Sequence, residues 1–339
     1  MSGSDHTSRG SAVRRDLIVG LILIACAAMI PFLFPVRYVI TQVTLFFIYA
    51  IVVSQWNLVL GVAGIFSLAQ MALFACGGYV TAMLGLYMDW SLWAAMPVGA
   101  ICAVVMSTVI GLACLRLHGP YVALLTLAIA QVMYLLITTD TECFVKTATR
   151  CEPFSGGTSG LRRFGDLGFR KLLGGDWIIA NYFVGLGLLV LAMVFSAAIT
   201  RGRLGLAFRA LRDNLGYARS RGISQFKYQL MVFALSAFFT GFAGAFYAAH
   251  FKSIGPTVFS FTLLLMLLAM IVVGGIGTVW GPIVGAVIIM LVDEGLREFQ
   301  DYRTMGLGLI LAVFVLFLPK GVVGALETLF RRNPGNTDS

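Results

Sequence analysis

The chain has 339 residues, of which 59% are hydrophobic and only 12% are charged. An ordinary soluble domain has roughly 45–50% apolar and about 25% charged residues, so this composition excludes a soluble enzyme, a nucleic-acid-binding protein and a disordered protein. The net charge of +9 is then best explained by the enrichment of Lys and Arg in cytoplasmic loops, not by nucleic-acid binding. We predict an all-α polytopic membrane protein with about ten transmembrane helices.

The predicted helices are apolar runs close to the length that a bilayer span takes, about 20 residues. They cover 17–34, 41–60, 65–85, 93–115, 121–139, 178–200, 229–249, 261–276, 280–296 and 305–319. A signal peptide is the alternative for the first run. No small-residue cleavage site follows Phe32–Pro35, so we interpret this run as a retained helix.

Glycine-rich breaks interrupt the apolar pattern at two places. Gly274–Gly281 separates the short runs 261–276 and 280–296, and Gly61–Gly64 opens the third run. The two short runs are either two full spans or a pair of half-helices around a cavity. The recurrence of such a break hints at an internal duplication, which is common in transporters.

The distribution of basic residues predicts the topology. An inside N-terminus and ten spans place 14 of the 24 Lys and Arg in the cytoplasm, seven of them between Arg201 and Lys227. Both termini are then cytoplasmic. The expected organisation is a tail at 1–16, a transmembrane permease domain at 17–319 and a second tail at 320–339. Within the domain, 140–176 is a periplasmic loop and 201–228 is a cytoplasmic loop.

The periplasmic loop contains Cys143 and Cys151, which the topology places in an oxidising compartment. We predict a disulfide between them, with two free thiols as the alternative.

No combination of residues predicts catalysis. The three histidines are too far apart in the sequence to suggest a metal site, and no phosphate-binding Gly-Lys-Ser/Thr loop is present. We therefore expect no catalytic residue, metal or cofactor. Neutral polar residues do occur within spans, and an unsatisfied amide is costly in lipid, so Asn57, Gln70 and Gln131 should face the bundle interior. They either bond neighbouring helices or line a path for a small polar solute.

The basic cytoplasmic loop has helical spacing over Arg201–Asn214, which places Leu206, Ala210 and Leu211 on one side. The following segment ends at Gly222, a position suited to a helix C-cap. Such a loop either holds the topology by its charge or docks on a cytoplasmic partner.

At this loop the sequence resembles the M-type (LivM-like) permease subunits of branched-chain amino-acid ABC importers. The matching stretches lie in order over roughly 38–325. They are Gly61–Tyr79, Gly119–Ala128, Gly156–Leu161, Ala210–Leu230, Phe233–Ala248 and Gly274–Ala286. The loop departs from the family pattern at Leu215, where an acidic residue is usual, and at Tyr217, where alanine is usual.

The resemblance implies the ABC importer permease fold and a multi-pass protein of a bacterial inner membrane. It implies four kinds of partner: a second homologous permease, two ATP-binding cassette subunits, a periplasmic solute-binding protein and the lipid bilayer. The residues that would couple to the ATPase are Arg209, Arg212, Asp213, Asn214, Ala218, Arg219, Gly222 and Ile223.

ATP hydrolysis would then occur on a separate subunit, and the permease would work by alternating access. Two alternatives stay open. One is a permease of the same family for urea or short amides. The other is a stand-alone secondary carrier, which usually has an intramembrane carboxylate.

Overall fold

The computed structural model describes residues 20–115, 117, 119–147, 150–170, 174–296, 303–317 and 321–325. The predicted tail 1–16 and most of the tail 320–339 lie outside the described residues. Each of the ten apolar runs contains a helix. These are Gly20–Leu33, α2 (Arg37–Asn57, continued by the π-helical turn Leu58–Val62), α3 (Gln70–Tyr87), α4 (Leu92–Cys114), α5 (Pro120–Thr138), α7 (Trp177–Arg201), α10 (Gln225–Phe251), α11 (Phe261–Gly274), α12 (Gly281–Gly295) and α13 (Arg303–Phe317).

Six helices of the described part are long and apolar enough to cross a membrane: α2 with its π-helical turn, α3, α4, α5, α7 and α10. By contrast, α11 has 14 residues and α12 has 15. At about 1.5 Å of rise per residue, each is shorter than the roughly 30 Å hydrocarbon core. This geometry supports the half-helix alternative for these two runs, and ten full spans stay a prediction.

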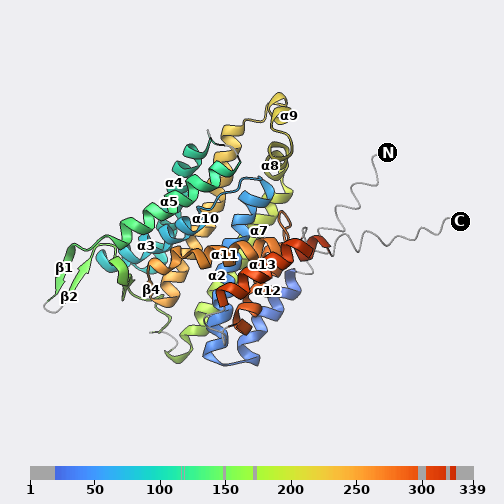
Figure 1. Cartoon of the computed structure of the whole chain (residues 1–339). Coiled ribbons are helices and arrows are strands. Elements are labelled where there is room, and N and C mark those ends of the chain that lie inside the picture. Colours follow the sequence, from blue (N-terminus) through green and yellow to red (C-terminus); the bar gives the residue numbers. More distant parts are fainter. Residues whose placement is uncertain are drawn as a thin grey trace.

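The bundle core is formed by α3, α4 and α10, with α2 packed against α7 and α10 (Figure 1). The helix backbones approach closely where glycines face each other. A Cβ atom added at Gly77 would collide with the backbone of Gly241, and one added at Gly244 would collide with the backbone of Phe74. Small residues at helix crossings allow such contact in membrane bundles.

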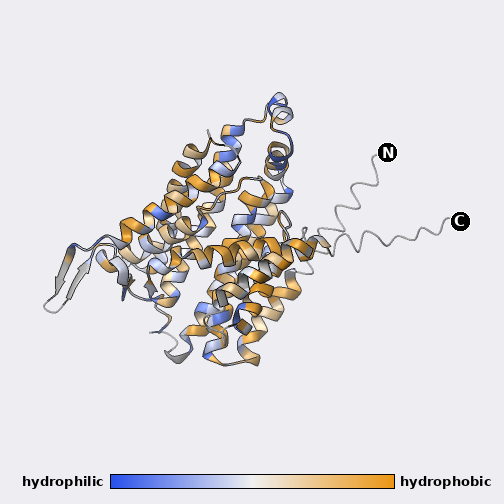
Figure 2. Ribbon diagram, in the orientation of Figure 1, coloured by the Kyte–Doolittle hydropathy of each residue, from blue (hydrophilic) through white to orange (hydrophobic). Residues whose placement is uncertain are grey.

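Hydrophobic residues predominate along the helices of the bundle (Figure 2), and some of their side chains are exposed. Large exposed side chains on α4 and α5 include Ile101, Val105, Val109, Leu124 and Leu136. Lipid tails are as apolar as these side chains, so a membrane bundle presents such a surface without an aqueous penalty.

The loop between α5 and α7 contains short strands that the all-α prediction lacked. β1 (Cys143–Thr147) and β2 (Arg150–Pro153) form a hairpin, and β3 (Leu161–Arg162) pairs with β4 (Ser253–Ile254). In the hairpin, Cys143 lies opposite Pro153, and Cys151 lies opposite Lys146. The side chains of both cysteines lie outside the described residues, so their disulfide stays a prediction.

The basic loop forms two short helices, α8 (Arg203–Asp213) and α9 (Leu215–Ser220). Figure 1 shows them at one end of the bundle and the β1–β2 hairpin at the opposite end. The placement of segments 201–228 and 140–176 on opposite faces of a membrane stays a prediction.

Candidate coupling site

The helical structure of the basic loop is interrupted at Asn214, whose backbone is extended with φ −154° and ψ 101°. The Asn214 side-chain oxygen accepts a 3.0 Å hydrogen bond from the backbone N–H of Tyr217. A side chain that accepts in this way satisfies one of the free N–H groups at a helix start. Asn214 therefore ends α8 and begins α9, and Asp213, the last residue of α8, forms an exposed ion pair with Arg212.

The side of α8 that carries Leu206, Ala210 and Leu211 is not its buried side. Leu206 is 55% exposed, whereas Ala210 and Leu211 are half-buried. The buried residues of the helix are Gly205, Ala207 and Phe208. Packing against the preceding and following helices selects this side, since Phe208 contacts the Tyr228 ring on α10 with centroids 6.1 Å apart.

The end of α9 confirms the expected glycine cap. Gly222 has φ +81°, its N–H bonds the carbonyl of Arg219 at 2.9 Å, and the N–H of Ile223 bonds the carbonyl of Ala218 at 3.1 Å. These two bonds and the left-handed glycine are the Schellman motif. Ala218 is buried, and Arg219 hydrogen-bonds Gln225 at the start of α10. The cap thus sets the turn from α9 into α10.

Arg212 connects the basic loop to the first glycine-rich break. Its Nη1 donates a 2.7 Å hydrogen bond to the carbonyl oxygen of Gly61. Its aliphatic part lies against Gly64, where an added Cβ would collide with the Arg212 side chain. Gly64 also has φ +71°, a conformation that glycine adopts most readily.

Asn57 connects the first break to the second. Its Nδ2 donates a 2.8 Å hydrogen bond to the carbonyl of Thr278, and its Oδ1 accepts one of 2.8 Å from the N–H of Gly277. A Cβ at Gly61 would collide with both the Asn57 side chain and the Gly277 backbone. One continuous set of contacts therefore runs from Arg212 through Gly61 and Asn57 to the α11–α12 turn.

Two clefts lie beside the basic loop, and the smaller of them borders this set of contacts. A cleft of about 230 Å³ lies between Arg212 on α8, Gly64 and the start of α10. A cleft of about 480 Å³ lies beside Arg219 and Gly222. Tyr217 (59%) and Phe226 (57%) are exposed in this region, and Arg209 lies half-buried on α8. Exposed aromatic and basic side chains beside a cleft provide a surface on which another protein could dock.

The three predicted polar residues do not meet in one place. Asn57 and Gln70 are buried, and Gln70 hydrogen-bonds Thr240 across α3 and α10. Gln131 is exposed on α5, which corrects the expectation that it faces the interior of this chain. Within this chain, Asn57 and Gln70 bond neighbouring segments.

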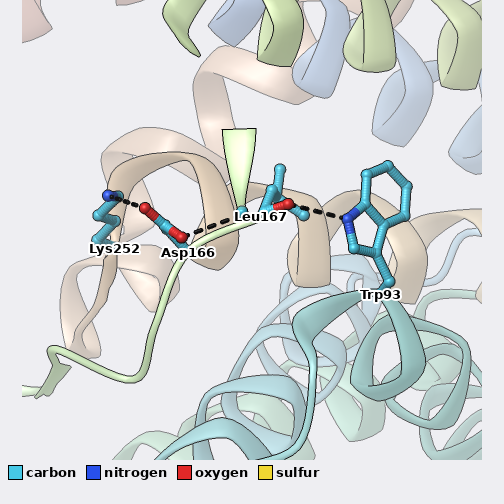
Figure 3. A network of polar contacts seen from close by, with 5 residues as sticks. Trp93, Asp166, Leu167 and Lys252 are labelled. Carbon is cyan, nitrogen blue, oxygen red and sulfur yellow. Dashed lines mark hydrogen bonds and ion pairs between the residues drawn. The ribbon is translucent and has the colours of Figure 1, made fainter. Parts of the chain in front are cut away.

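The opposite end of the molecule has its own polar contacts (Figure 3). Lys252 donates to Asp166 at 3.1 Å and lies 4.9 Å from the centre of the Trp177 ring. Trp93 Nε1 donates to the carbonyl of Leu167 at 3.0 Å. The loop after β3 is thereby attached to α4, α7 and the end of α10.

The charge of Asp166 is stabilised in this position. Partial burial by itself raises the pKa of a carboxyl group. The hydrogen bonds from Lys252 and the Gly168 N–H, together with the charges of Lys252 and Arg170, outweigh burial and hold the pKa of Asp166 below its usual value. In the sequence, Asp166 and Lys252 are visible only as loop charges, because their contact joins positions 86 residues apart.

Comparison with known proteins identifies the family. Residues 38–318 match the model of the family described as "Branched-chain amino acid transport system / permease component". The chain is 29% identical to the LivM permease protein of the high-affinity branched-chain amino acid transport system of Escherichia coli (strain K12), over 93% of this chain and 76% of the relative. It is 23% identical to the LivH permease protein of the same system and strain, over 87% of this chain and 97% of that relative.

A shorter similarity, 29% identity over 42% of this chain and 40% of the relative, links it to the xylose transport system permease protein XylH of the same strain. No solved structure matches the chain. The family match covers most of the chain, including both glycine-rich breaks and the α8–α9 loop. The chain therefore belongs to the family of branched-chain amino acid transport permease components.

Proposed function

We propose that this chain is one membrane-spanning subunit of an ATP-driven importer of branched-chain or related amino acids in a bacterial inner membrane. It works with a second permease homologous to it, two ATP-binding cassette subunits and a periplasmic solute-binding protein. Both of its termini are cytoplasmic. The LivM and LivH relatives support this assignment, because both belong by name to a branched-chain amino acid transport system.

The observation that carries the proposal is the bond between Arg212 and Gly61. It joins a basic segment, partly exposed to solvent, to a break in a helix that is long enough to span the membrane. A permease that receives force from a separate ATPase needs such a contact. A helix pair that only held the topology by its charge would not.

The contacts described above support the following mechanism. ATP binding moves the ATPases, and α8 and α9 move with them because they are held in a groove of that partner. Arg212 transmits the displacement to Gly61, and Asn57 passes it to Gly277 and Thr278. The segments around both breaks then shift together, and the side to which the solute path opens changes.

The test is reconstitution of the complete importer in proteoliposomes with its binding protein. We expect ATP-dependent uptake of the solute that the binding protein binds. That protein is titrated with leucine, isoleucine, valine, urea and acetamide. Uptake of an amide alone would assign the solute to the amide class, and uptake by this chain without ATPase subunits would show a secondary carrier instead.

A substitution in the basic loop distinguishes a role in ATPase coupling from a role in membrane topology alone. Arg219→Glu should leave membrane insertion intact while weakening ATPase association, because it reverses a charge on the docking face. Arg162→Glu, the same charge reversal at an exposed arginine of β3 in the loop between α5 and α7, is the matched control. Normal ATPase association and normal solute-stimulated hydrolysis by Arg219→Glu would contradict the coupling role of this face.

A further inference from the structure

A large cavity lies between the helix Gly20–Leu33 and helices α2, α7 and α12, away from the coupling site. Its volume is about 790 Å³. The walls are formed almost entirely by aliphatic and aromatic side chains, among them Leu189, Met193 and Ile283. On α7 alone the wall extends from Leu186 to Arg201, which is about 22 Å at the helical rise of ~1.5 Å per residue.

The polar groups of the cavity lie at its two ends. Tyr38, Gln42 and Glu294 lie at one end, where Gln42 donates to the Tyr38 hydroxyl at 2.9 Å and that hydroxyl donates to Glu294 at 2.6 Å. Arg201 lies at the other end, as the last residue of α7. α2 and α7 run in the same direction, since Phe47 contacts Tyr182 and Gln55 bonds Ala192. The start of α2 and the end of α7 are therefore far apart.

Trp280 contributes an unused hydrogen-bond donor near the Arg201 end. Its Nε1 is buried and has no hydrogen-bond partner among the described residues. Its ring also lines the cavity and lies against Gly20. Trp280 immediately precedes α12, next to the turn that Asn57 bonds at the end of α2. A buried indole N–H usually has a partner, so this donor indicates a ligand acceptor.

We propose that this cavity binds one anionic phospholipid, with an acyl chain along the α7 wall and the phosphate near Arg201 and Trp280. The apolar walls accept an acyl chain, because its methylene groups find the same apolar surroundings there as in the bilayer. The cationic end favours a phosphate, as basic pockets between membrane helices do. The opposite end disfavours it, because Glu294 is an acid already bonded to Tyr38.

A zwitterionic amino acid fits the cavity less well, because it would bury two charges against apolar walls, at a high cost in free energy.

The experiment measures lipid retention by native mass spectrometry of the purified full chain in detergent. Dioleoyl phosphatidylglycerol and dioleoyl phosphatidylcholine are each titrated onto the delipidated protein. We expect one tightly held lipid with a preference for phosphatidylglycerol. Arg201→Gln should lower that preference about fivefold, the effect of about one cation near a membrane surface, and Trp280→Phe should weaken retention of both lipids. Arg203→Gln, on α8 and outside the cavity lining, is the charge control.

Ala197→Trp fills the cavity and should abolish the tight lipid, whereas Val105→Trp on the exposed face of α4 should not. A photoactivatable phosphatidylglycerol with a diazirine in its acyl chain then maps the site on the unmutated protein. Cross-links should fall on α7 between 186 and 197 and on α12 between 283 and 291. Equal lipid retention by Ala197→Trp and the unmutated chain, equal affinity for the two lipids, or cross-links confined to other helices would overturn the proposal.

Discussion

The guanidinium of Arg212 donates a 2.7 Å hydrogen bond to the carbonyl oxygen of Gly61, although 151 residues separate the two. A carbonyl beside a helix break lacks its regular helical donor, and Arg212 supplies one from the basic loop. The break at the end of α2 is therefore bonded to α8, the helix that we propose moves with the ATPase.

Replacing Arg212 with Gln should uncouple transport. A hydrogen bond to a charged group contributes about 1.5–3 kcal/mol, and Gln is too short to keep the bond to Gly61. We expect solute-stimulated ATP hydrolysis by the reconstituted importer to fall at least tenfold, as a loss of ~1.5 kcal/mol implies. Arg203→Gln, which removes an exposed charge from the same helix, should change hydrolysis less than twofold. Equal effects of the two substitutions would rule out a specific role for Arg212.

Replacing Asn57 with Ala should destabilise the fold. The substitution leaves the Gly277 N–H and the Thr278 carbonyl without their partner, at a cost of about 1–3 kcal/mol. We expect a lower unfolding midpoint in detergent, measured by intrinsic tryptophan fluorescence. Gln131→Ala removes an exposed amide and serves as the control, with a change within ~0.5 kcal/mol. An unchanged midpoint for Asn57→Ala would mean that the bonds between the two breaks contribute no stability.

Substitutions at Gly222 test whether the left-handed backbone of the α9 cap is needed for ATPase binding. A Cβ atom at this position meets nothing within 4 Å, yet φ is +81°. A β-branched residue is strained there, whereas Asn tolerates the left-handed region better. Gly222→Val should therefore reduce co-purification of the ATPase with the permease, and Gly222→Asn should largely retain it. Equal loss in both variants would show that ATPase binding requires the absence of any side chain at this position, and not the left-handed backbone of the cap.

The ion pair between Asp166 and Lys252 should make stability depend on acid pH. The pKa of Asp166 is lowered in the folded chain, so its contribution is present above the unfolded-state value, near 3.9. It is lost as the pH falls through the lower folded-state value. Asp166→Asn should lower the unfolding midpoint at pH 7 by the equivalent of about 0.2–1 kcal/mol.

The difference between Asp166→Asn and the unmutated chain should shrink as the pH is lowered below the unfolded-state value, since Asp166 becomes protonated first in the unfolded chain and then, at lower pH, in the folded chain. A difference that stays constant between pH 7 and pH 3 would contradict the ion-pair contribution.

The predicted disulfide between Cys143 and Cys151 would close the β1–β2 hairpin and stabilise it by roughly 2–3 kcal/mol in the chain-entropy model. Thiol labelling of intact spheroplasts should leave both cysteines unmodified until a reductant is added. Immediate modification of both would show free thiols. Protection that persists after reduction would show that burial shields them.

Local patterns in the sequence were sufficient to predict several features of the structure. Apolar runs predicted where helices form, because any backbone that crosses lipid must bond internally. The spacing around Gly222 predicted the cap, because a C-cap depends on residues within one turn. The basic loop between Arg201 and Lys227 was singled out by charge alone. One expectation from local sequence, that Gln131 faces the interior of this chain, is wrong, because Gln131 is exposed on α5.

Tertiary structure decided which faces pack and which distant residues meet. In a membrane bundle the lipid-facing side is as apolar as the core, so hydropathy cannot distinguish the exposed Val105 from the buried Ala103 on α4. Contacts such as those of Arg212 with Gly61, or of Lys252 with Asp166, join segments far apart in the chain. Their formation depends on the packing of whole helices, which no local spacing of residues records.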